Sequence, residues 1–211
     1  MLNASALPFA REINSLSFQW RPLEPHRLGA ELRAAAELAR RHLTEAARAI
    51  GVRQHFEVRR GDPVPHLTET CLATDVVVVA APRRTNHHAT RFGETTRRSA
   101  ASVLFLPPGA GPARGPARGL ARGPIIAVTT GAGDRALAVA RSIAAVSEER
   151  LLILARDGEG DRLIPGTSVH DIATALAGTR ERLIVVTRDG APDGSELAAA
   201  RGAPVLSVEP V

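Results

Sequence analysis

The sequence from Gly61 to Pro82, GDPVPHLTETCLATDVVVVAAP, decides the expected fold of this chain. It begins with a turn at Gly61–Pro63, continues as an amphipathic segment expected to be helical over residues 64–73, and ends in the four valines Val76–Val79. An unbroken β-branched run of this length predicts a strand over residues 75–81 that is buried on both faces. A strand covered on both faces needs helices above and below a mostly parallel sheet, so the expected fold class is α/β.

Helices and strands alternate outward from this stretch. Upstream, apolar residues at steps of three and four predict a helix over residues 28–50 that ends at Gly51, and a strand over residues 52–58 follows. The apolar stripe of that helix consists of Leu28, Leu32, Ala35, Ala39, Leu43, Ala46 and Ile50. Downstream, helices are predicted over residues 89–101, 135–148, 169–176 and 194–201, and strands over residues 102–106, 125–130, 151–155, 183–187 and 204–208. This alternation favours parallel strands joined by right-handed crossovers.

Composition limits the class of protein. Aromatic residues make up only 3% of the 211 residues, so the core must consist of Ala, Val, Leu and Ile. Residues 1–108 carry fifteen arginines against ten acidic residues, and residues 125–211 carry nine against twelve. A basic front and an acidic back favour mutual attraction over specific nucleic-acid binding, because no recognisable reading element accompanies the charge. The single cysteine, Cys71, and the absence of a long apolar run predict a cytoplasmic protein without a membrane span.

A glycine- and proline-rich segment divides the chain. Residues 109–123 read GAGPARGPARGLARG, a composition that cannot pack a core and therefore predicts a linker. The expected organisation is a front half over residues 1–108 and a back half over residues 124–211. The two halves repeat the same order of elements, which indicates an internal duplication.

Several short motifs resemble the universal stress protein family. They are VRRGDP at Val58–Pro63, DVVVVA at Asp75–Ala80, SVLFLPP at Ser102–Pro108, IIAVTTGAGDRALAVARSIA at Ile125–Ala144 and GSELAAARGAPVLSVEP at Gly194–Pro210. The resemblance implies a tandem member with two shortened halves. The front half lacks a counterpart of the first strand and helix, and the back half lacks the elements that residues 28–58 supply in front. Either the start is truncated or misassigned, or the two halves complete each other.

The resemblance also implies an adenine-nucleotide site that binds ATP, in a weakened or lost form. Nucleotide-binding members carry G-x-x-G, nine residues, then G-[ST] after the fourth strand, where backbone N–H groups and a helix N-terminus receive phosphate. In the front half, Ala80 and Arg83 replace the glycines and Thr90 alone matches. In the back half, Gly194-Ser195 match and Gly190 is a possible partner, but only three residues separate Gly190 from Gly194. The implied phosphate residues are therefore Gly190, Gly194 and Ser195, with Thr130 and Gly131 nearby.

The resemblance implies a stress-response or regulatory module, and a non-catalytic one is expected because no general base or set of metal ligands is visible. The alternative is a protein-interaction scaffold that has no ligand and acts through its basic front half. In the resembled family the last strands pair edge to edge, so residues 102–106 and 204–208 are expected to meet in an intramolecular pseudo-dimer, or to allow self-association between chains.

Three other features have a functional and a structural interpretation. The first is a cluster of cationic side chains around Glu94 that would bind phosphate or another polyanion, or form a solvated surface. It comprises Arg83, Arg84, Arg91, Arg97, Arg98, His87 and His88. His87 and His88 lack a third ligand at a spacing that suits a metal. Cys71 shares an apolar face with Val64 and Leu67, which favours a buried small side chain over a redox thiol.

Overall fold

The computed structural model describes residues 11–13, 20–22, 25–58, 71–80, 99–108, 122–129, 131, 134–156, 160–189 and 192–209. The chain forms two compact units, Met1–Gly61 and Asp62–Val211. Strands β3 and β4 of the predicted front half belong to the second unit, together with the whole predicted back half. The predicted division into halves at residues 109–123 stays a prediction, since most of that segment lies outside the described residues.

The first unit contains a hairpin and one long helix. Strand β1 (Arg11–Ile13) pairs antiparallel with β2 (Trp20–Pro22). Helix α1 (Pro25–Ile50) confirms the helix predicted over residues 28–50 and begins three residues earlier. Its end is also as predicted: Gly51 has a φ of 70°, and the N–H groups of Gly51 and Val52 donate to the carbonyls of Arg48 and Ala47. These two bonds satisfy carbonyls that the last helical turn would leave free.

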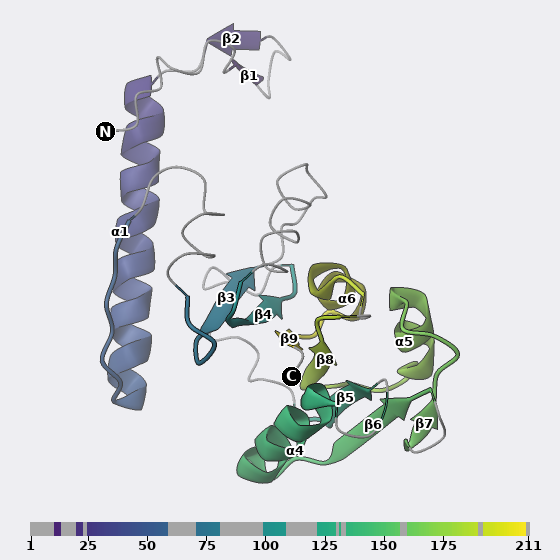
Figure 1. Ribbon diagram of the computed structural model, residues 1–211. Coiled ribbons are helices and arrows are strands. Elements are labelled where there is room, and N and C mark those ends of the chain that lie inside the picture. Colours follow the sequence, from purple (N-terminus) through teal and green to yellow (C-terminus); the bar gives the residue numbers. More distant parts are fainter. Residues whose placement is uncertain are drawn as a thin grey trace. The chain divides into compact units, whose positions relative to one another are not determined.

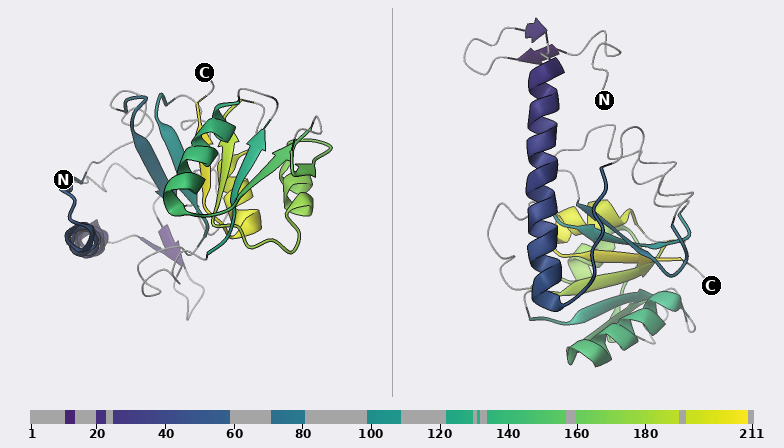
Figure 2. Two further views of the ribbon diagram at one scale, coloured as in Figure 1. Left: turned by 90° about the horizontal axis from the view of Figure 1, so that it is seen from below. Right: turned by 90° about the vertical axis from the view of Figure 1, so that its left-hand side faces the viewer.

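The strand predicted over residues 52–58 is wrong. This segment runs back along α1 without strand pairing (Figures 1 and 2). The Gln54 side chain donates to Thr44 Oγ1 at 3.3 Å, and Phe56 is half-buried, while Val52 and Val58 are 54% and 59% exposed. Alternating apolar residues form a strand only when a neighbouring strand takes their backbone hydrogen bonds, and within the described residues none does.

The second unit contains a seven-stranded sheet in the order β3-β4-β9-β8-β5-β6-β7. Its strands are β3 (Val76–Ala80), β4 (Ser102–Leu106), β5 (Ile125–Thr129), β6 (Leu151–Ala155), β7 (Arg162–Leu163), β8 (Leu183–Thr187) and β9 (Val205–Val208). All neighbours are parallel except β4 and β9. The chain is therefore an α/β protein with a mostly parallel sheet, as predicted. Only β7 was not predicted, because its two residues lie in a polar segment.

Helices cover both faces of this sheet. Helix α4 (Arg135–Ser147) lies on one face, and α5 (Val169–Ala175) and α6 (Gly194–Arg201) lie on the other (Figures 1 and 2). Alternate residues of a strand point to opposite faces. Accordingly, Ile125 and Ala127 of β5 pack in the cluster beneath α4, whereas Ile126 and Val128 pack in the cluster beneath α5 and α6. Strand β5 is buried along its whole length.

The predicted pairing of the two closing strands is confirmed within the chain. Strand β4 pairs antiparallel with β9, with Val103 opposite Ser207, Leu104 opposite Leu206 and Phe105 opposite Val205. Each strand also has its parallel neighbour, β3 for β4 and β8 for β9. Both edges of both strands are thus occupied inside one molecule.

The expectation that Val76–Val79 is buried on both faces is wrong. Strand β3 lies at one edge of the sheet, where Val76 and Val78 are 56% and 57% exposed. Only Val77 and Val79 pack against the core, on the side of α5 and α6. A run of valines shows that a segment suits a pleated surface, but it does not show whether the strand is central or peripheral.

The helices predicted over residues 64–73 and 89–101 lie largely outside the described residues. The described ends of both segments, residues 71–73 and 99–101, are not helical. Cys71 is a free, partly buried thiol. In the part of the chain that the structure describes, no helix is long and apolar enough to cross a membrane.

Candidate functional site

The strand order of the second unit defines a position where α/β sheets bind ligands. From β5 the chain passes through α4 to β6 on one side, and from β8 it passes through α6 to β9 on the other side. The order therefore reverses between β5 and β8. Ligands of open α/β sheets bind beyond the carboxyl ends of the strands at such a reversal. The predicted residues Gly131, Gly194 and Ser195 all lie at this carboxyl edge, whereas Thr130 and Gly190 lie outside the described residues.

The turn after β5 is held by Thr129, the last residue of that strand. Thr129 Oγ1 donates to the carbonyl of Gly131 at 2.8 Å, and the N–H of Gly131 donates to Thr129 Oγ1 at 3.1 Å. Thr129 is 3% exposed. Both partners of this buried hydroxyl are therefore backbone groups of its own turn, and the interaction has a structural role. Among the described residues, no atom lies within 4 Å of the place that a Cβ on Gly131 would take, so the described packing does not require a glycine there.

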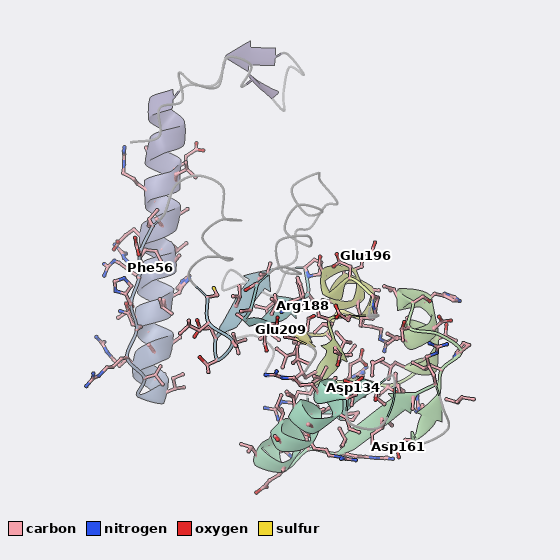
Figure 3. The ribbon with its side chains drawn as sticks, in the orientation of Figure 1. Phe56, Asp134, Asp161, Arg188, Glu196 and Glu209 are labelled. Carbon is pink, nitrogen blue, oxygen red and sulfur yellow. The ribbon has the colours of Figure 1, made fainter. Side chains whose placement is uncertain are left out.

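The N-terminus of α4 is closed by an aspartate, Asp134. Asp134 Oδ1 accepts a hydrogen bond from the N–H of Ala136 at 2.9 Å and another from the hydroxyl of Thr187, at the end of β8. The Thr187 oxygen also receives the Ala136 N–H at 3.3 Å. Asp134 projects from the carboxyl edge of the sheet (Figure 3). A carboxylate thus occupies the helix N-terminus and links the two strands between which the order reverses.

The N-terminus of α6 is closed in the same way. Asp193 Oδ1 accepts hydrogen bonds from the N–H groups of Ser195 and Glu196, at 2.8 and 3.4 Å. Free N–H groups and the positive end of the helix dipole are what make a helix N-terminus bind phosphate. Here the chain's own carboxylate takes those donors and adds a negative charge. The N–H of Ser195, which the resemblance assigns to phosphate, already donates to Asp193.

Gly194 has a packing role. A Cβ at this position would stand 2.5 Å from Cδ2 and 2.6 Å from Cε2 of Phe105, a side chain of β4 that is 4% exposed. Real Cβ atoms do not approach other atoms so closely. Any residue other than glycine would therefore displace the aromatic ring or the first turn of α6. The glycine that matches the nucleotide motif is explained by the contact between α6 and β4.

Arg188, a cation at this edge, contacts backbone carbonyls of the chain. Its guanidinium donates to the carbonyls of Ser99 and Ala101, just before β4, and its backbone N–H donates to the carbonyl of Val208 at 2.8 Å. Burial lowers the pKa of Arg188, and the nearby charges of Glu209 and Asp189 act in the opposite direction. Arg188 and Glu209 are labelled in Figure 3. Arg188 therefore joins the segment before β4 to the ends of β8 and β9.

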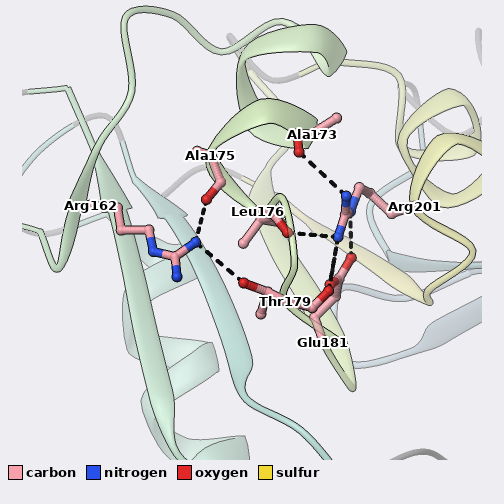
Figure 4. Close-up of polar contacts among 7 residues, drawn as sticks. All are labelled: Arg162, Ala173, Ala175, Leu176, Thr179, Glu181 and Arg201. Atoms are coloured by element: carbon pink, nitrogen blue, oxygen red, sulfur yellow. Dashed lines mark hydrogen bonds and ion pairs between the residues drawn. The ribbon is translucent and has the colours of Figure 1, made fainter.

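A second polar cluster surrounds the C-terminal end of α5 (Figure 4). Arg201 forms a two-pronged ion pair with Glu181, at 2.7 and 3.0 Å, and donates to the carbonyls of Ala173, Leu176 and Thr179. The hydrogen bond to Glu181 raises the pKa of Arg201. These bonds satisfy carbonyls that a helix end leaves free. They involve all three guanidinium nitrogens of Arg201, so the described contacts of this side chain stabilise the fold.

The roles of several residues at the candidate site were not predicted from the sequence. Asp193 had a local signal, because the order Asp-Gly-Ser-Glu resembles a capping box at the start of a helix. Thr187, Arg188 and Phe105 had none, since each acts through a partner far away in the chain. The predicted cationic cluster, from Arg83 to Arg98, lies outside the described residues. Within the described residues no group of three or more His, Cys, Asp or Glu side chains comes together in a way that suits a metal ion.

Comparison with known proteins supports the fold. Neither a known protein family nor a curated protein matches the sequence. The structure is similar to the crystal structure of a functionally unknown protein, PA1789 from Pseudomonas aeruginosa PAO1, with a TM-score of 0.55 and 14% sequence identity. The match covers 82% of this chain and 78% of that chain. At this identity the likeness supports a Rossmann-like α/β architecture and says nothing about a ligand.

Proposed function

We propose that this chain is a non-catalytic stress-response or regulatory module of the universal-stress type, in which the adenine-nucleotide site has been lost. The observation that carries the proposal is the closure of both helix N-termini at the strand reversal by carboxylates. Asp134 and Asp193 accept the N–H groups that a phosphate would use. Each also places a negative charge where a nucleotide would bring its own.

The charge balance at this edge supports the same conclusion. A nucleotide triphosphate needs cations or several free N–H donors to offset its charge. The guanidinium of Arg188 donates to Ser99 and Ala101, and Gly194 packs on Phe105. These contacts support the proposal that the edge no longer binds ATP. In this proposal the Rossmann-like sheet remains, and the residues that the resemblance assigns to phosphate hold the chain's own elements together.

Titration calorimetry with ATP and magnesium tests this proposal on the full chain. We expect no saturable heat up to about 1 mM ATP, which corresponds to binding weaker than about −4 kcal/mol. The variant Asp193→Asn is titrated in the same way for comparison with the unaltered chain. It removes one negative charge from the N-terminus of α6 and keeps an oxygen that can cap the helix. Saturable binding of ATP by the unaltered chain in the micromolar range would overturn the loss of the site. Gly194→Val is unsuitable as a binding variant, because it would also disturb Phe105.

A second candidate function is a protein-interaction scaffold that has no ligand and acts through its basic front half. The exposed surface of α1 favours it, since Leu32 and Leu43, which lie on one side of the helix, are 44% and 39% exposed. Apolar side chains gathered on one exposed surface are typical of interaction sites. Nucleotide binding without any self-association or partner binding would count against this candidate and in favour of a ligand-regulated module.

A further inference from the structure

No further inference is drawn: the strongest candidate, the exposed face of Val76 and Val78 on strand β3 at the edge of the seven-stranded sheet, carries none, because nothing in the structure shows what covers it.

Discussion

Gly194 and Phe105 are in contact across the junction of α6 and β4, with 2.5 Å between the ring and the place of a Cβ on Gly194. This contact and the pairing of β4 with β9 join segments that stand on opposite sides of residues 109–123. We expect Gly194→Ala to destabilise the chain by about 1–3 kcal/mol, because the added methyl group overpacks a buried junction. Urea denaturation measures the change in the free energy of unfolding.

The control for this prediction is Gly131→Ala, where the added Cβ would meet no atom within 4 Å. Its free energy of unfolding should stay within about 0.5 kcal/mol of the unaltered chain. Phe105→Leu should recover part of the loss when combined with Gly194→Ala, since the smaller side chain makes room for the methyl group. Equal effects of Gly194→Ala and Gly131→Ala would contradict the packing role of Gly194.

The two helix caps at the carboxyl edge, Asp134 and Asp193, accept hydrogen bonds from different kinds of donor. Asp193→Ala removes the acceptor for the Ser195 and Glu196 N–H groups and should cost about 1 kcal/mol. Asp134→Ala also leaves the hydroxyl of Thr187 without this acceptor, so it should cost more, about 2 kcal/mol. Thermal and urea unfolding of the two variants gives both values. A larger loss for Asp193→Ala would contradict the link between Asp134 and β8.

The buried ion pair of Arg201 and Glu181 should behave asymmetrically. The Glu181 side chain is 2% exposed, so Arg201→Ala leaves an unpaired carboxylate in the interior and should destabilise the chain by about 3 kcal/mol. The paired change Arg201→Met/Glu181→Leu should cost less than Arg201→Ala alone, because no isolated charge remains. For comparison, Arg182→Ala breaks the more exposed pair with Glu149 and should cost about 1 kcal/mol or less. Comparable losses for Arg201→Ala and Arg182→Ala would contradict this account.

Glu37 on α1 gives a prediction about pH. Hydrogen bonds from Arg40 and Arg41 lower the pKa of Glu37 from 4.5 to about 2. A carboxylate whose pKa is lower in the folded state stabilises the fold above the unfolded pKa, and this contribution is lost as the pH falls from about 4.5 through about 2. Carboxyl ¹³C NMR measures the titration directly. Arg40→Gln should move the pKa of Glu37 back towards 4.5, and an unchanged pKa in that variant would exclude the pair as the cause.

Much of the second unit could be predicted from the sequence because its signals are local. Strands β6 and β8 and helix α6 have the predicted bounds, since each is a continuous apolar or amphipathic run between glycine, proline and charged residues. The cap at Asp134 was predictable for the same reason: a side chain that bonds a backbone N–H two residues later needs no distant partner. The pairing of β4 with β9 was predicted from the resemblance to the universal stress protein family, in which the last strands pair edge to edge.

The errors concern properties that depend on distant segments. The four valines of Val76–Val79 suit a central strand and an edge strand equally well, and their exposure is decided by what covers them. Residues 52–58 alternate like a strand but find no neighbouring strand among the described residues. At the candidate site, the sequence matched Gly194 to a phosphate motif, whereas its close neighbour is Phe105, which no local pattern indicates.

The most direct test of the central claim follows the backbone amides of Ser195 and Glu196 by NMR during titration with ATP and magnesium. The account places both N–H groups in hydrogen bonds with Asp193, so their signals should not shift in a saturable way up to about 1 mM nucleotide. Saturable shifts of these amides at micromolar ATP would contradict the account, because they would show that phosphate displaces the carboxylate and that a nucleotide site persists at the start of α6.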